Sequence, residues 1–91
     1  MMKIRKHYIF KGRVQAVGFR YTAYKEARKL SLTGFVKNLN NGNVEAEFQG
    51  EAHLIDEVIK KLKYDRFIYI ASMKVDNIDV IENETSFEVL Y

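Results

Sequence analysis

The sequence predicts an α+β sandwich, in which an antiparallel sheet carries two helices on one of its faces. Segments rich in β-forming residues, several with strict apolar–polar alternation, predict strands near both ends and in the middle of the chain. Two intervening segments place apolar residues at helical spacing. The 91 residues suit one domain, 1–91.

Residues 4–14 predict the first strand, because β-forming side chains dominate them and Tyr8 and Phe10 share one alternating face. Residues 21–32 predict a helix. Its apolar positions recur at helical spacing: Phe19, Ala23, Ala27 and Leu30. Thr33-Gly34 is expected to end this helix, with the glycine as its stop.

A hairpin follows the first helix. Residues 35–39 and 43–48 predict its two strands, and Asn40-Asn41-Gly42 predicts the turn, since Asn-Gly is a strong hairpin signal. In the second strand Glu45 and Glu47 alternate with apolar residues, which predicts one buried and one solvated face.

The second half of the chain predicts a helix and two further strands. Residues 51–63 carry one apolar stripe and predict the helix. An aromatic connector spans 64–70, and strands are expected at 72–80 and 86–91.

This order, β-α-β-β-α-β with a short extra C-terminal strand, is the ferredoxin-like pattern. In it the strands at 4–14 and 35–39 run in the same direction, with the strand at 43–48 between them. Their ends should therefore meet at one edge of the sheet, about 10 Å apart. The loop 15–20 and Asn38 would then face each other across a gap that a phosphate and a water could fill.

Composition excludes several classes of site. The chain has no cysteine, which rules out disulfides, thiolate zinc sites and a cysteine nucleophile. No apolar run approaches the roughly 20 residues of a membrane span, and the N-terminal residues lack the continuous apolar stretch of a signal peptide. Nothing pairs His7 with His53, so we expect no metal site. We expect a cytoplasmic protein without a membrane partner.

Charge is distributed unevenly. Residues 1–30 hold nine Lys/Arg and one acid, Glu26, whereas the C-terminal segment is acidic. The difference is consistent with solvated faces of opposite sign, or with a positive field around the first loop that attracts anions. Two glutamates on the outward face of the 43–48 strand would repel a nucleic-acid backbone, so no nucleic-acid partner is expected.

Residues 12–20, which read GRVQAVGFR, join the first strand to the first helix. The stretch contains two glycines and no acidic residue, and it ends in Arg20. A short loop that opens a helix presents several backbone N–H groups on one side. With an arginine beside them, this loop predicts a socket for a phosphate or sulfate anion.

Together with a second segment, this stretch resembles the two signature motifs of the acylphosphatases. The second segment is Gly34-Phe35-Val36-Lys37-Asn38, followed by Gly42, Val44 and Gly50. The first motif departs from the family at Ala16, where glycine is usual, while length and element order match along the whole chain. The resemblance implies hydrolysis of acyl phosphates, the mixed carboxylic–phosphoric anhydrides, to carboxylate and phosphate without metal or cofactor.

The resemblance also implies residue roles. Arg20 would bind the phosphoryl group and Asn38 would position the attacking water. The backbone of the loop would cradle the phosphate oxygens through Gln15, Ala16, Val17, Gly18 and Phe19. Elementary chemistry agrees, because a guanidinium offers a planar fork of donors to two phosphate oxygens. A carboxylate is also a good leaving group, so no strong acid or base is needed.

Alternatives stay open at this point. Arg20 could be a surface arginine at a helix start, and Asn38 could be a turn residue that satisfies a backbone group. Tyr21 and Tyr24 are expected to serve packing. If Ala16 needs a left-handed backbone, alanine costs on the order of 1 kcal/mol and could shift the cradle. We expect the enzyme to remain active with alanine at this position; the alternative is a catalytically weakened, acylphosphatase-like anion-binding module. We also expect the protein to be a monomer.

Overall fold

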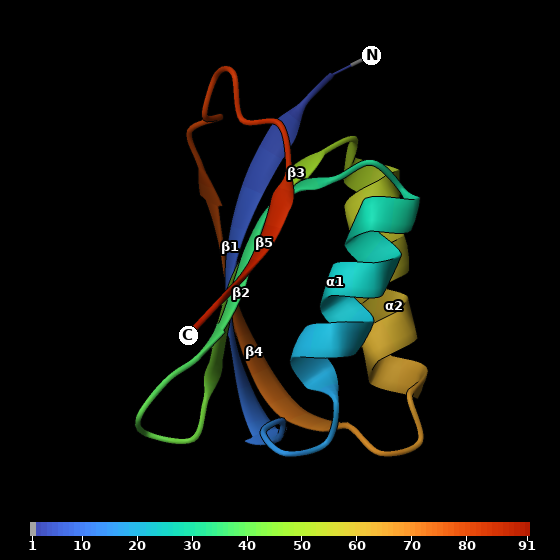
Figure 1. Cartoon of the computed structure of the whole chain (residues 1–91), viewed down its shortest axis with the longest axis vertical. Helices are drawn as coiled ribbons and strands as arrows, with labels where there is room; N and C mark the ends of the chain where they lie inside the picture. The colour runs from blue at the N-terminus through green and yellow to red at the C-terminus, as the bar shows by residue number, and fades with distance from the viewer. Residues whose placement is uncertain (1) are drawn as a thin grey trace.

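Two helices lie side by side on one face of a five-stranded sheet in the computed structural model, which describes residues 2–91 (Figure 1). The elements follow in the order β1 (Ile4–Arg13), α1 (Phe19–Lys29), β2 (Thr33–Asn38), β3 (Val44–Gly50), α2 (Ala52–Tyr64), β4 (Tyr69–Ile78) and β5 (Phe87–Leu90). The predicted α+β, ferredoxin-like architecture is confirmed.

The strands are ordered β4-β1-β3-β2-β5 across the sheet. β3 is antiparallel to both β1 and β2, so these two strands run in the same direction, as predicted. The short C-terminal strand departs from the antiparallel pattern of the rest of the sheet, because β5 pairs with β2 in parallel. β4 and β5 lie at opposite edges, so the connection at 79–86 carries the chain from one edge of the sheet to the other (Figure 1).

The register fixes where the ends of β1 and β2 meet. Phe10 of β1 and Asn38 of β2 are both aligned with Val44 of β3. The three residues form one row across the sheet. Asn38 therefore lies two strands away from the point at which β1 leads into the loop before α1.

The core lies between the helices and the sheet face that they cover. Strand alternation explains its sheet side, since every second residue of β1 and β3 points toward the helices. The rings of Phe10 and Phe19 pack with centroids 4.9 Å apart. Both are fully buried or nearly so. This contact fixes the strand before the loop to the first residue of the helix after it.

The boundaries of α1 differ from the prediction. The helix begins at Phe19 and ends at Lys29, because Ser31 adopts a left-handed conformation with φ 58° and turns the chain toward β2. Gly34 is not the helix stop. It lies inside β2, where a Cβ atom would overlap the carbonyl oxygen of Glu47 in the neighbouring strand. Only glycine permits this close approach.

β4 begins earlier than expected, at Tyr69, because the predicted aromatic connector is partly strand. Tyr69 and Ile70 pair with Arg13 and Gly12 of β1, beyond a register shift that follows Lys11. The hairpin turn at 40–42 forms as predicted. Gly42 has φ 93°, and its N–H donates to the carbonyl of Leu39 at 3.2 Å.

Candidate active site

The N-terminus of α1 is open to an external partner. Gly18 is its N-cap with φ 83°, and no side chain caps the first turn. The first amides of a helix have no intrahelical acceptor, and its N-terminus carries partial positive charge. No acidic residue lies in the first turn to offset that charge. Amides and dipole together favour an anion at this point.

The loop before the helix contains a second left-handed residue. Ala16 has φ 62°, which decides the question that the sequence left open: this position does take the conformation that favours glycine. Alternating left-handed residues in a short loop turn successive N–H groups toward one concave side, the geometry of an anion nest. The Ala16 residue is exposed, so its methyl group does not displace core packing.

Gln15 ties this loop to the β2–β3 hairpin. Its side-chain Nε2 donates to the carbonyl oxygens of Leu39 and Asn43, each at 2.8 Å. The amide of Leu39 also donates to the carbonyl of Asn43 at 2.9 Å, which closes the hairpin at the same place. Sequence reasoning gave Gln15 a role through its backbone alone. Its side chain links the loop to the end of the strand that carries Asn38.

Arg20 and Asn38 line one cavity of about 280 Å³. Its walls come from the loop, the first turns of α1, the end of β2 and the end of the chain: Val14, Ala16, Gly18, Phe19, Arg20, Tyr21, Tyr24, Asn38, Val89 and Tyr91. The geometry brings together most of the predicted site. Gln15 and Val17 do not line the cavity, and Val17 packs partly buried against the core.

Asn38 presents an unpaired amide oxygen. Its Oδ1 is buried and has no hydrogen-bond partner within residues 2–91. The turn that follows takes its hydrogen bonds elsewhere, since Asn41 Oδ1 accepts from the amide of Asn43 at 3.0 Å. The turn-residue interpretation of Asn38 therefore lacks support. A buried acceptor without a protein donor suits a water or ligand in the cavity.

Arg20 keeps its charge uncompensated by carboxylates. No ion pair to it occurs in the described part of the chain. Its guanidinium instead lies over the ring of Tyr91, with the carbon Cζ 4.9 Å from the ring centroid. A ring on the face of a guanidinium leaves the N–H donors in its plane free. Arg20 can therefore stack on the tyrosine and bind an anion at the same time.

Five cavity residues were missed from the sequence, and they are Val14, Tyr21, Tyr24, Val89 and Tyr91. Tyr21 is 67% exposed, so the packing role expected for it is wrong, whereas Tyr24 both packs on the core and lines the cavity. The spacing of Tyr24, four residues after Arg20, places the two on one helix face and could have indicated it. Val89 and Tyr91 enter through the parallel pairing of β5 with β2, which no local signal predicts.

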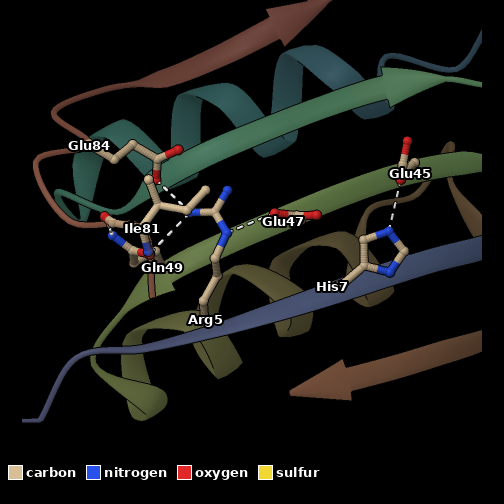
Figure 2. Close-up of polar contacts among 7 residues, drawn as sticks. All are labelled: Arg5, His7, Glu45, Glu47, Gln49, Ile81 and Glu84. Carbon is tan, nitrogen blue, oxygen red and sulfur yellow. Dashed lines mark hydrogen bonds and ion pairs between the residues drawn. The ribbon is translucent and has the colours of Figure 1, made fainter. Parts of the chain in front are cut away.

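Residues 2–91 contain no group of three potential ligands placed to hold a metal ion. His7 instead pairs with Glu45 at 2.8 Å, on the sheet face away from the helices (Figure 2). Across the same residues, every helix is too short or too polar to cross a lipid bilayer.

Comparison with known proteins places the chain in a family. The sequence model described as acylphosphatase matches residues 6–89. A protein of Clostridium beijerinckii named acylphosphatase is 43% identical, over 97% of this chain and 99% of the relative. The crystal structure of acylphosphatase from Bacillus subtilis superposes with a TM-score of 0.88 at 31% identity, covering 97% of this chain and 99% of that one.

An acylphosphatase structure from Coxiella burnetii gives a TM-score of 0.85 at 32% identity, over 97% of this chain and 93% of the other. Sequence and fold thus agree along nearly the whole length of both partners in each comparison. The chain belongs to the acylphosphatase family.

Proposed function

We propose that this chain hydrolyses acyl phosphates in the cavity between α1 and β2. The phosphoryl group binds to the backbone amides of residues 15–19 and to Arg20, and Asn38 holds the attacking water. One observation carries the proposal: the charged guanidinium and the unpaired, buried Oδ1 of Asn38 line the same cavity. Family membership supports the same reaction.

In the proposed step, a water donates a hydrogen bond to Asn38 Oδ1, which aims an oxygen lone pair at phosphorus. The water oxygen bonds to phosphorus while the bond between phosphorus and the acyl oxygen breaks. The electron pair of that bond leaves with the carboxylate. Both water protons pass to phosphoryl oxygens, which gives dihydrogen phosphate. Because the carboxylate leaves readily, positioning and charge stabilisation carry the catalysis.

Charge at the phosphoryl oxygens is offset from two directions. Arg20 supplies a full positive charge in bidentate geometry, and the first turn of α1 supplies amides and the dipole. The monomeric state stays a prediction. The cytoplasmic location and the independence from metals stay predictions.

The decisive test measures hydrolysis of benzoyl phosphate in EDTA by the wild type, Arg20→Ala and Asn38→Ala. We expect EDTA to leave the wild-type rate unchanged and Arg20→Ala to lose nearly all turnover and phosphate inhibition. Asn38→Ala should lower kcat by about a hundredfold or more with little change in KM, because water orientation matters in the transition state. Arg66→Ala, which removes an exposed arginine outside the cavity, is the control.

A folded wild-type protein that hydrolyses no acyl phosphate would overturn the proposal. A normal rate for Asn38→Ala would remove the water-positioning role alone. In ¹⁸O-labelled water, attack at phosphorus places the label in phosphate. Label in the carboxylate would show attack at the acyl carbon instead, which the proposed step forbids.

A further inference from the structure

We infer that Glu84, held by Arg5, is a positioning residue for Arg20, and that it acts through β5 and the ring of Tyr91 from the opposite end of the sheet. The inference rests on the proposed function, because it concerns how the phosphate-binding arginine of that site is oriented. Neither Glu84 nor Arg5 lines the cavity, so the effect does not involve contact with the substrate.

The first step is the weakness of β5 as an element. It has four residues, Phe87–Leu90, and lies at one edge of the sheet, where it pairs with β2. A short edge strand opens at a low free-energy cost unless contacts outside the strand hold it. Val89 lines the cavity and Tyr91 follows the strand directly, so one wall of the cavity depends on how β5 is held.

The second step is the network that holds the chain before β5 (Figure 2). Arg5 donates from Nε to Glu47 and from Nη1 to Glu84, each at 2.7 Å. Gln49 donates to the carbonyl oxygen of Ile81 at 2.9 Å and accepts from its amide at 2.8 Å. The Arg5 side chain is 1% exposed, so salt screens its ion pairs only weakly. These contacts fix the connection before β5 to β1 and β3.

The third step is what the core already fixes in β5. Phe87 is 1% exposed and its ring stacks on Phe48, with centroids 5.2 Å apart. The carbonyl of Ser86 also accepts from the amide of Gly34 at 3.2 Å. Phe87 thus holds the start of β5 on the helix-facing side of the sheet, whereas Glu84 is held on the opposite side. Contacts on both sides fix the direction of the strand as well as its position.

The fourth step is the far end of β5. The ring centroid of Tyr91 lies 4.9 Å from the guanidinium carbon Cζ of Arg20. In the part of the chain that the structure describes, no carboxylate pairs with Arg20. The stacked ring therefore restricts the plane of the guanidinium, which decides where its N–H fork points. Tyr91 is 93% exposed, so the strand that precedes it, rather than surrounding packing, sets the position of the ring.

The two ends of this arrangement lie far apart. Arg5 is aligned with Gln49, and Val44, in the row of Asn38, lies five residues away along β3, which is about 17 Å. A change at Glu84 therefore reaches the cavity through β5 and not by direct contact. Loss of Glu84 and loss of the Tyr91 ring should then have the same effect on phosphate binding.

The test is a double-mutant cycle with Glu84→Ala, Tyr91→Ala and the variant that carries both. NMR titration of backbone amides gives the dissociation constant of inorganic phosphate, and benzoyl phosphate gives kcat and KM. Either single substitution should raise the phosphate constant and KM about three- to fivefold, the effect of a lost cation–π contact, and change kcat by less than about twofold. The double variant should bind phosphate no more weakly than the weaker single variant.

A spectroscopic readout follows Arg20 itself. The ring current of Tyr91 shifts the Nε–Hε resonance of Arg20, which is assigned by its absence in Arg20→Lys. Glu84→Ala should move this resonance in the same direction as Tyr91→Ala. Loss of stability alone would not move it in the folded protein.

Two further variants serve as controls. Glu84→Gln keeps an acceptor for Arg5 and should restore both the resonance and the phosphate constant. His7→Ala removes the contact to Glu45 at 2.8 Å on the same sheet face, without touching the connection before β5, and should leave both unchanged. In Glu84→Ala, Arg5 keeps Glu47 and Gln49 as partners, so this variant is expected to fold.

An unchanged phosphate constant or an unmoved Arg20 resonance in Glu84→Ala would overturn the positioning role. A double variant about tenfold or more weaker than the wild type would overturn it as well, since the two effects would then multiply. Equal weakening in His7→Ala would show a general effect of lost contacts instead. If the wild type binds phosphate but hydrolyses no benzoyl phosphate, the proposed function fails, while the binding cycle still tests Glu84.

Discussion

At the scale of single residues, the site depends on Arg20, Asn38 and Ala16. A buried carbonyl oxygen without a partner costs about 1–3 kcal/mol, so the unpaired Oδ1 of Asn38 is explained once a water in the cavity donates to it. Ala16 carries a different cost. Its left-handed backbone strains an L residue by roughly 1–2 kcal/mol, and this strain sits within the phosphate cradle.

Replacement of Ala16 by glycine tests how much that strain matters. Glycine relieves it but adds entropy to the unfolded chain, so the free energy of unfolding should rise by about 1 kcal/mol or less. The amides already take the required conformation with alanine, so kcat/KM should change by less than about tenfold. Urea unfolding and benzoyl phosphate kinetics check both. A rate more than about a hundredfold faster would instead support the weakened anion-binding module.

At the scale of elements, the site forms where three of them end. β1 delivers the loop, α1 begins after it, and β2 ends at Asn38. The Phe10–Phe19 contact holds the two ends of the loop, while Gln15 holds its middle against the β2–β3 hairpin. The Gln15 side chain therefore holds the middle of the amide cradle close to Asn38.

Removal of this tie is predicted to loosen the cradle without unfolding the protein. Gln15→Ala leaves the Leu39 and Asn43 carbonyls without its Nε2 donor and should lower the free energy of unfolding by about 1–2 kcal/mol. Inhibition by inorganic phosphate should weaken about tenfold. Asn41→Ala, which removes one hydrogen bond in the same hairpin, controls for loss of a polar contact. If the inhibition constant of phosphate were unchanged in Gln15→Ala, the Gln15 side chain would not be needed to position the loop.

At the scale of the whole molecule, the connection at 79–86 brings the last strand to the site. On the sheet face away from the helices, Arg5 donates to Glu47 and Glu84 at 2.7 Å and to Gln49 at 3.1 Å (Figure 2). Gln49 exchanges two hydrogen bonds with the backbone of Ile81. Burial would lower the pKa of Arg5, but hydrogen bonds to Glu84 and Glu47 raise it overall.

Breaking this network should be costly. Arg5→Met leaves two carboxylates without their cation and should lower the free energy of unfolding by about 3–5 kcal/mol, because the Arg5 side chain is 1% exposed. Glu84→Gln keeps an acceptor for Arg5 and should cost only about 1 kcal/mol. Urea unfolding compares the two variants. Equal, small losses would show that the network does not stabilise the connection.

Alkaline pH provides a separate whole-molecule test. Burial, with a smaller contribution from Asp56, raises the pKa of Tyr8 from 10.0 to about 12. The neutral phenol is favoured in the folded state, so this stabilisation is complete below pH 10 and is lost as the pH rises toward 12. The loss amounts to about 2–3 kcal/mol. In the Tyr8→Phe variant, the free energy of unfolding measured with urea should decline less between these pH values than in the wild type. An identical decline in both proteins would contradict this role of Tyr8.

The sequence by itself determined the element order, the face that the helices cover and the two motifs of the site. These depend on local signals: alternation, helical spacing, and a glycine-containing loop that ends in Arg20. Few topologies are compatible with this element order, and the ferredoxin-like one predicts that the loop approaches Asn38. The fold and the chemistry of the site could be predicted from the sequence because each depends on residues close together in the chain.

The tertiary structure alone decided what depends on distant contacts. Gly34 proved to serve a close approach to Glu47, and Ala16 proved to be left-handed. Tyr91 and Val89 reach the cavity because β5 crosses to the far edge and pairs with β2. Neither backbone angles nor the pairing of edge strands leaves a local pattern, since both are set by the packing of segments that lie far apart in sequence.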